Sequence, residues 1–304
     1  MLLDALDKAI LNGLGLNCRV SYQTLAKQNG VTATAVKKRI DRLLETGVIV
    51  TFTAELNLAM IDADYLLILV YTDGQHDDGK LADEIGQNQM VSEVGVLSGS
   101  MIIAFASYRD AKDLAELRSF LMSMDGVTKV EMHTLLFPRG KKMELKHLHI
   151  KILRCLVDDP RMPVTEIADR TRLAARTVTR GINEILEGEG VRISLRWNLN
   201  AADCITFLMK IEWDESRANL GDVLGWLREH FPQEFWEPLI CASENMMFAA
   251  FVVETLKDMS RIGNEIRICP FIISHAALLG EPSKSYPDIR RYKLEEILES
   301  KGVQ

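Results

Sequence analysis

The sequence lacks the long apolar segments that would cross a membrane. It has no uninterrupted apolar run of about 18 residues, so we expect no transmembrane helix. The first four residues carry neither a basic region nor a signal-peptide pattern. We therefore expect a cytoplasmic protein that makes no membrane contact.

Cysteine is scarce, and its spacing excludes the common metal and redox motifs. The five cysteines are scattered and none forms a CxxC pair, so the sequence predicts neither a zinc ribbon nor a thioredoxin-type site. HExxH and HxxxH patterns are absent, as are GxGxxG, the Walker motif and GxSxG. We therefore expect no metal, no cofactor and no catalytic residue, and we predict that the protein is not an enzyme.

The net charge of −7 argues against nucleic-acid binding when the whole chain is considered, but the charge is not evenly distributed. Residues 1–50 carry seven Lys and Arg against four Asp and Glu, and residues 145–197 carry ten against seven, so each segment has a charge of +3. The rest of the chain must then sum to −13, which is −7 − 6. Two basic segments in an acidic protein favour local phosphate contact with little non-specific attraction elsewhere.

The most informative feature that the sequence does have is an internal repeat. Residues 7–45 align without a gap with residues 149–187, at a constant offset of 142 (149 − 7 and 187 − 45). The identical pairs are almost all apolar and spaced like helix core positions; they include Ile10/Ile152, Leu11/Leu153, Leu14/Leu156, Ala26/Ala168, Val36/Val178, Ile40/Ile182 and Leu44/Leu186. The repeat is too long for a solenoid unit and indicates a duplicated module.

Each copy of the module begins with three predicted helices and a strand. The helices are expected at residues 3–14, 22–28 and 35–45, and again at 145–157, 164–171 and 175–186. A short helix, a tight turn and a helix with an apolar inner face are typical of a helix-turn-helix. The β-branched residues 48–53 and their counterparts 191–197 predict a strand or wing. The alternative is a small helical bundle whose charged face is only solvated.

The remainder of each half predicts a sheet domain in the order βαββαβ, which is the ferredoxin-like arrangement. The strands are expected at residues 65–71, 90–97, 101–108 and 127–137, and again at 204–213, 236–242, 246–254 and 268–279. Helices are expected at 78–87, 110–124, 220–231 and 256–266, with a helical tail at 287–300. The fold class is therefore α+β, with predicted domains 1–54, 55–138, 139–200, 201–282 and 283–304.

A winged helix-turn-helix followed by a βαββαβ domain resembles the Lrp/AsnC (leucine-responsive regulator) family of prokaryotic transcription factors. The resemblance covers nearly the whole chain, twice, and is carried in the first copy by residues 6–11, 25–26, 36–43, 45–49 and 126–130. It implies double-stranded DNA as a partner, a recognition helix in the major groove, and homo-oligomers (dimers or higher) formed through the sheet domains. It also implies that a small-molecule effector is possible.

The resemblance also assigns candidate DNA-facing residues by position. They are Thr32, Thr34, Lys37, Lys38, Arg39 and Arg42 in the first copy, and Arg176, Thr177, Thr179, Arg180 and Asn183 in the second. Asn and Arg side chains can read base edges in two-pronged hydrogen bonds, whereas Lys supplies charge to phosphate. The second copy keeps the apolar core positions of the first but changes more of its surface residues. Two interpretations of the second copy therefore stay open: a second DNA-reading head or a structural partner.

One departure from the family pattern bears on function. The hairpin at residues 98–101 lacks the acidic residue of members that sense amino acids, so effector binding has no support in the sequence. In the corresponding hairpin, Glu244 is expected to be an exposed turn residue.

Sirohaem decarboxylases of haem biosynthesis share the module order and are the enzymatic alternative. His133 and His275 favour it because they are also 142 residues apart (275 − 133), but strand histidines at a sheet edge or dimer seam explain them more simply.

Overall fold

The computed structural model describes residues 2–300 and divides into two compact units. One comprises residues 2–8, Asp64–Phe137 and Asn198–Tyr286, and we call it the sheet unit. The other comprises Ala9–Ala63, Pro138–Trp197 and residues 287–300, and we call it the helix unit. Both helix-turn-helix modules therefore belong to one unit and both sheet domains to the other. The division does not follow the two sequential halves of the chain.

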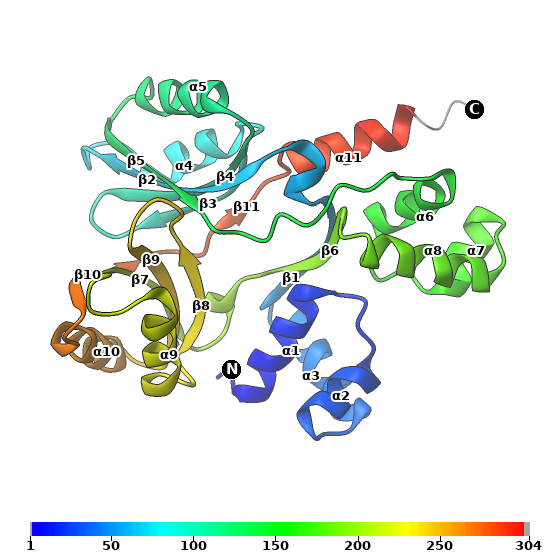
Figure 1. The fold of residues 1–304 in the computed structure, drawn as a ribbon, viewed down its shortest axis with the longest axis horizontal. Coiled ribbons are helices and arrows are strands. Elements are labelled where there is room, and N and C mark those ends of the chain that lie inside the picture. The colour runs from blue at the N-terminus through cyan, green and yellow to red at the C-terminus, as the bar shows by residue number, and fades with distance from the viewer. Residues whose placement is uncertain (1, 301–304) are drawn as a thin grey trace. The chain divides into compact units, whose positions relative to one another are not determined.

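The helix unit contains both predicted three-helix modules (Figure 1). Their helices are α1 (Ala5–Leu16, whose first turn belongs to the sheet unit), α2 (Tyr22–Asn29) and α3 (Ala33–Glu45), then α6 (His147–Asp158), α7 (Val164–Thr171) and α8 (Ala175–Glu187). Ser21 caps α2 by accepting a hydrogen bond from the Thr24 N–H at 3.0 Å. Gly30 ends that helix in the left-handed conformation (φ 66°), which glycine adopts without strain. Both helix-turn-helix predictions are confirmed.

The strands that we predicted as wings pair with each other. β1 (Ile49–Leu56) and β6 (Val191–Trp197) form a two-stranded antiparallel ribbon in which Thr53 lies opposite Ser194. Each copy thus supplies the strand that satisfies the backbone of the other copy. Alternate residues of the ribbon, among them Ala54 and Ile193, enter one apolar core with α6, α7 and α8.

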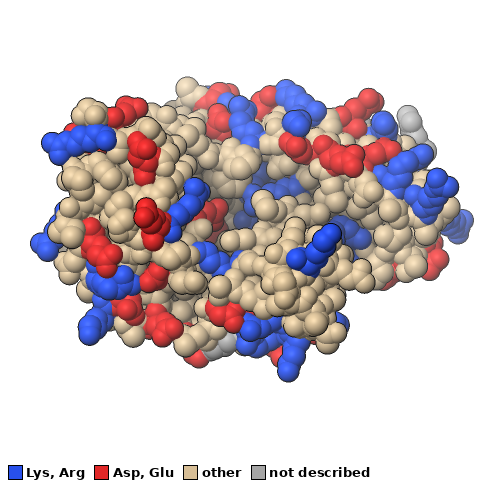
Figure 2. All heavy atoms as spheres, turned by 60° about the horizontal axis from the view of Figure 1, so that its bottom comes forward, with Lys and Arg blue, Asp and Glu red and all other residues tan. Residues whose placement is uncertain are grey.

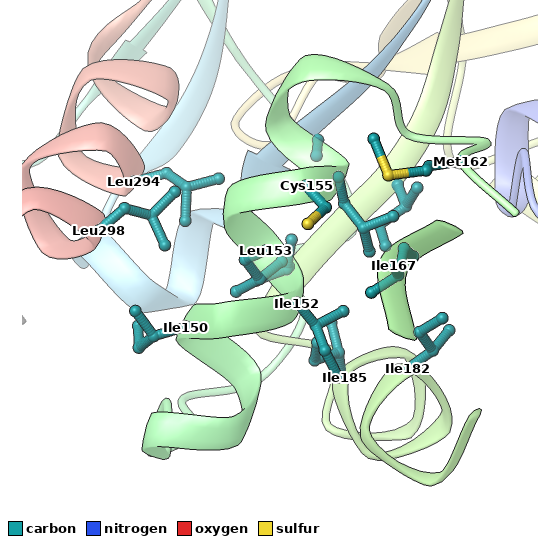
Figure 3. Packing of buried hydrophobic residues seen from close by; sticks show 14 of the residues in the cluster. Ile150, Ile152, Leu153, Cys155, Met162, Ile167, Ile182, Ile185, Leu294 and Leu298 are labelled. Carbon is teal, nitrogen blue, oxygen red and sulfur yellow. The ribbon is translucent and has the colours of Figure 1, made fainter. Parts of the chain in front are cut away.

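The C-terminal tail contributes to both units. After β11 (Lys284–Ser285), which extends an edge of the first sheet, α11 (Ile289–Ser300) packs in the helix unit. Leu294 and Leu298 are buried, and Figure 3 shows them directed at the side of α6 that carries Ile150. The tail helix thereby completes the core that the ribbon and the second helix-turn-helix share.

The sheet unit contains two ferredoxin-like domains, which confirms the predicted fold class. The first consists of β2 (Asp64–Thr72), α4 (Asp78–Gly86), β3 (Val91–Leu97), β4 (Met101–Tyr108), α5 (Ala111–Met122) and β5 (Val127–Leu135). The second consists of β7 (Ile205–Trp213), α9 (Leu220–His230), β8 (Phe235–Ile240), β9 (Met246–Val253), α10 (Leu256–Ile268) and β10 (Ile272–Leu279). The antiparallel orders are β11-β3-β4-β2-β5 and β10-β7-β9-β8. Short 3₁₀ helices at Leu58–Ile61 and Leu199–Ala201 precede β2 and β7.

The two sheets join at their edges and pack through their helix-free faces. An isolated bridge links Leu135 to Cys241 at one edge, and another links Leu97 to Gly280. Leu66, Ile68 and Val70 face α4 and α5, so the alternating Leu67 and Leu69 lie on the other face, where they are nevertheless buried. Contacts such as that between the His133 and Phe248 rings, 5.5 Å apart, show that the second sheet covers this face.

One strand boundary was wrong in a way that matters for the site. We predicted a strand over residues 268–279, but α10 continues to Ile268 and β10 begins at Ile272. A bulge follows between Ile272 and Ser274, so the pairing with β7 shifts register there. Such a shift exchanges the faces to which the side chains point.

Candidate nucleic-acid interface

The recognition helix of the first copy is α3. Val36, Ile40 and Leu43 are buried on its inner side, which leaves Thr34 and the two lysines that follow it, Lys37 and Lys38, exposed. Thr32 sits at the N-cap, where its hydroxyl accepts a hydrogen bond from the Ala35 N–H at 3.2 Å. Thr32, which we assigned to DNA contact, thus caps the N-terminus of α3 in the free protein.

The two lysines on this face differ in electrostatic environment. Lys37 donates a hydrogen bond to Asp41, at 2.7 Å, and this bond raises the pKa of the Lys37 ammonium. Lys38 makes no ion pair with any residue among 2–300. Phosphate would therefore compete with Asp41 for Lys37, whereas the charge of Lys38 is available without competition.

Arg39 and Arg42 are half-buried, and both have electrostatic or hydrogen-bonding partners. The first turn of α3 and its outer face are thus more accessible than these two arginines. Lys37, Lys38 and Arg42 against Asp41 and Glu45 give this face a formal charge of +1 (3 − 2). This charge would act on phosphate over about one Debye length, roughly 8–10 Å at physiological salt.

The matching helix of the second copy, α8, presents a different surface. The exposed side chains of Arg176, Thr179, Arg180 and Asn183 line a hollow together with Glu184 and Glu187. Thr177, also assigned to DNA, is half-buried, and Ala174 at the N-cap has no side-chain oxygen to accept a capping bond. Two arginines and two glutamates make the face of α8 formally neutral (2 − 2).

Glu184 is the residue that most distinguishes the second copy. Its carboxylate lies 2.9 Å from Nε2 of His149, 3.4 Å from Nε of Arg180 and 3.8 Å from Nζ of Lys146. The hydrogen bond with His149 is the main cause of the lowered pKa of Glu184. Arg180 therefore has an acidic neighbour within its own helix, and the carboxylate would repel an approaching phosphate.

Charge over the rest of the surface is mixed. Figure 2 shows Lys and Arg side chains interspersed with Asp and Glu side chains over the face that it presents. This pattern agrees with local phosphate contact by a helix face and gives no broad basic surface in that view. In residues 2–300, no helix is both long enough and apolar enough to span a membrane.

The two repeat-related histidines do not share a site. His133 lies opposite Leu67, on the face of the first sheet that packs against the second sheet. His275 lies opposite Ile211, which belongs to the core beneath α9 and α10, because the bulge in β10 shifts the register. The equal spacing of these two histidines favoured a shared enzymatic site, but their side chains lie on different faces of the two sheets.

Sequence reasoning missed one cluster of ligating side chains. His133, Cys241 and Glu244 bring potential metal-ligating atoms within 4.8 Å of one another. His133 lies more than 100 residues before the other two (241 − 133 = 108), so no motif spacing could join it to them. We expected Glu244 to be only an exposed turn residue, and it is exposed, but it lies 3.2 Å from Nδ1 of His133.

Comparison with known proteins assigns the chain to a family. The AsnC-type helix-turn-helix domain model matches residues 3–44, and a winged helix-turn-helix DNA-binding model matches residues 145–184. An uncharacterised HTH-type transcriptional regulator of Pyrococcus horikoshii is 34% identical over 141 residues, which are 45% of this chain and 93% of the relative. The HTH-type transcriptional regulator LrpA of the same organism is 32% identical over 131 residues, 42% of this chain and 93% of that protein.

A solved structure shares the tandem fold over almost the full length. The crystal structure of the siroheme decarboxylase NirDL superimposes with a TM-score of 0.58 at 15% sequence identity, over 97% of this chain and 98% of that one. At this identity the likeness concerns the fold alone. The helix-turn-helix matches and the regulator relatives decide the assignment: the chain belongs to the Lrp/AsnC family of helix-turn-helix transcription regulators and carries the family's module twice.

Proposed function

We propose that this protein regulates transcription by placing α3 in the major groove of double-stranded DNA. The observation that carries the proposal is the face of α3, where Thr34 and Lys38 are exposed and the formal charge is +1 (3 − 2), against zero for the matching positions of α8. An α-helix fits the major groove, and exposed side chains in its first turns reach the base edges there. The basic side chains then supply the phosphate contacts that fix the register of the protein on the duplex.

The second helix-turn-helix has a subordinate part in this proposal. Its Arg176, Thr179 and Asn183 are exposed and chemically able to contact DNA, but Glu184 and Glu187 lie on the same surface. We propose that α8 contributes less to DNA affinity than α3 and that its module serves mainly as a packing partner. The ribbon of β1 and β6 pairs one strand from each helix-turn-helix module within a single chain.

Assembly and sensing extend the proposal beyond the single chain. Homo-oligomers, dimers or higher, are proposed from family membership, together with the open edge of β10, on which Ile273 is 67% exposed. The proposal includes a small-molecule effector on the ground of family membership alone. Size-exclusion chromatography with light scattering measures the assembly directly, and a monomer at working concentrations would contradict that part.

A binding experiment on selected DNA tests the central step. Wild-type protein first selects duplexes from a random pool at low salt, and fluorescence anisotropy then measures affinity for the selected duplex. The variant Lys37→Ala/Lys38→Ala/Arg42→Ala removes three positive charges from α3. We expect affinity to fall by at least about tenfold, with a smaller dependence on salt, because fewer counterions are released on binding.

A matched control removes equal charge elsewhere. Lys80, Lys112 and Lys257 are exposed residues of α4, α5 and α10 in the sheet unit, so Lys80→Ala/Lys112→Ala/Lys257→Ala changes net charge by the same amount. We expect this control to keep wild-type affinity within about twofold. Equal losses in both variants would mean that net charge, and not α3, governs binding, and failure to select any duplex would contradict the proposal itself.

The decarboxylase alternative is the weaker hypothesis, because His133 and His275 face different cores of the sheet unit. A titration with an iron tetrapyrrole tests it through the visible absorption band. We expect no saturable change in that band. A saturable change that the His133→Ala/His275→Ala variant loses would favour the enzyme over the regulator.

A further inference from the structure

The joint between the two sheets holds a histidine whose environment is unusual. His133 is on β5, and its side chain is only 9% exposed. Within residues 2–300 neither ring nitrogen makes a hydrogen bond of acceptable geometry. Buried polar groups nearly always have partners, because leaving one unpaired costs about 1–3 kcal/mol. An imidazole that has carboxylates nearby but no hydrogen bond, at a packed joint, therefore points to a ligand.

Two further ligating side chains converge on the same point from the second sheet. Cys241 follows β8 and is buried, and Glu244 lies in the hairpin between β8 and β9. The backbone holds this hairpin against β5, since Ala242 N–H donates to the Thr134 carbonyl at 2.7 Å and Leu136 N–H donates to the Ile240 carbonyl at 2.8 Å. The positions of the ligating groups are thus set by strand pairing and not by a mobile loop.

The geometry of the three groups approaches that of a metal site. Their ligating atoms lie within 4.8 Å of one another, and Nδ1 of His133 is 3.2 Å from a Glu244 oxygen. Tetrahedral zinc, with bonds of about 2.0–2.3 Å to N, O and S, requires separations of about 3.3–3.6 Å between ligating atoms. Rotation of the exposed Glu244 and closure of the set by about 1 Å would meet this requirement.

We propose that His133, Cys241 and Glu244 bind one Zn²⁺ ion and that this ion ties β5 of the first sheet to the β8–β9 hairpin of the second. One nitrogen, one sulfur and one oxygen ligand form a set that zinc accepts and that Mg²⁺ and Ca²⁺, which prefer oxygen ligands, do not. Three protein ligands leave the fourth position of the tetrahedron for water or another small ligand. The thiol proton of Cys241 passes to solvent as the sulfur binds the metal.

The surroundings of His133 support one orientation of its ring. With Nδ1 directed at the metal, Nε2 faces Oε2 of Glu131, which is 3.8 Å away and is itself a buried oxygen without a hydrogen-bond partner. A metal-bound histidine usually donates its other N–H to a carboxylate, which fixes the ring. Lys129 and Lys210 lie 2.5 Å and 4.0 Å from the Glu131 carboxylate and offset its negative charge.

The site occurs once within residues 2–300, because the repeat does not reproduce it. The hairpin of the first sheet that corresponds to residues 243–245 is Ser98-Gly99-Ser100, which supplies neither a thiolate nor a carboxylate. His275, which follows His133 by 142 residues, lies beneath α10 and not at this joint. A stoichiometry of one zinc per chain follows, and His275 provides a natural control.

Metal binding by the full-length, tag-free protein tests the proposal. After treatment with a chelator, the protein is titrated with ZnCl₂ by calorimetry and with CoCl₂ by absorption spectroscopy. We expect one equivalent of each metal, with a sulfur-to-cobalt charge-transfer band that the Cys241→Ser variant lacks. His133→Gln and Glu244→Gln should weaken zinc binding at least about tenfold, whereas His275→Gln and Cys269→Ser should bind as wild type does.

Thermal unfolding separates a lost ligand from a lost fold. Zinc should raise the apparent unfolding temperature of the wild type and of His275→Gln but leave that of His133→Gln unchanged, since an ion stabilises only the state that binds it. Circular dichroism of each metal-free variant shows whether it is folded. A wild type that binds less than a fifth of an equivalent, or variants at His133 and Cys241 that bind like the wild type, would overturn the proposal.

Discussion

The buried ion network of the helix unit permits a quantitative prediction about stability. Glu55 on β1 accepts a hydrogen bond from Nη2 of Arg196 on β6 at 2.6 Å and lies 3.3 Å from Nη2 of Arg290, whose Nε donates to Asp288 at 2.7 Å. The Glu55 side chain is 10% exposed and that of Arg290 only 5%. We predict that Glu55→Gln destabilises the protein by about 3 kcal/mol, because it removes a buried carboxylate charge that lies beside two largely buried guanidinium groups.

The magnitude is at the lower end of the range for a broken buried pair. Removing one partner of such a pair costs about 3–5 kcal/mol, but the glutamine carbonyl still accepts one hydrogen bond and Asp288 remains beside Arg290. The control is an exposed pair of nearly equal length in α7, where Arg170 lies 2.7 Å from Glu166 and both side chains are about half exposed. Glu166→Gln should cost no more than about 0.5 kcal/mol, because water screens the pair.

Urea unfolding followed by circular dichroism measures both changes. Equal losses of stability in Glu55→Gln and Glu166→Gln would refute the reasoning that burial sets the magnitude. The comparison requires that the dependence of the free energy of unfolding on urea stay the same in the two variants.

The same carboxylate has a predictable acid dependence. Burial raises the pKa of Glu55, but the guanidinium groups of Arg290 and Arg196 outweigh burial and bring it to about 2 from 4.5. A lowered folded-state pKa contributes stability that is present above pH 4.5 and lost as the pH falls toward 2. The difference in free energy of unfolding between wild type and Glu55→Gln should therefore shrink over that window. Asp288, whose pKa is raised chiefly by burial, remains in both proteins.

Four further substitutions test packing and charge. Leu294→Ala should cost about 2–5 kcal/mol in urea unfolding, because Leu294 is fully buried where α11 meets α6. Gly181→Ala should cost about 1–3 kcal/mol, since its Cβ would lie 2.4 Å from Cδ1 of Ile152, whereas Gly225→Ala, with no atom within 4 Å, should gain up to about 1 kcal/mol. Asp41→Asn should tighten DNA binding and steepen its salt dependence by releasing Lys37; weaker binding would contradict the competition between Asp41 and phosphate.

Local features of the sequence predicted the helices well. Ser21 and Gly30 mark the two ends of α2, and the apolar spacing of Val36, Ile40 and Leu43 fixes the inner face of α3. These signals act within a few residues, so they can be read without knowing the rest of the fold. The order of strands and helices identified the ferredoxin-like domains for the same reason.

Non-local pairing could not be predicted from the sequence. Nothing in residues 48–53 specifies that β1 pairs with β6, since a β-branched segment does not encode its partner. The bulge near Ser274, which turns His275 toward the core beneath α10, is likewise a property of the paired strands. The cluster of His133, Cys241 and Glu244 arises because two sheets pack together, and the separate segments carry no sign of it. The division into five domains and the roles of the assigned DNA-facing residues stay predictions.

The salt dependence of DNA affinity for single variants of the two recognition helices tests the central claim most directly. Lys38→Ala removes from α3 a charge that has no ion-pair partner among residues 2–300, and Arg180→Ala removes from α8 a charge that lies 3.4 Å from Glu184. We predict that the slope of log affinity against log salt falls by about 0.9 in Lys38→Ala and by clearly less in Arg180→Ala. An unchanged slope in Lys38→Ala, or a larger change in Arg180→Ala, would contradict the account that α3 is the principal DNA-reading helix.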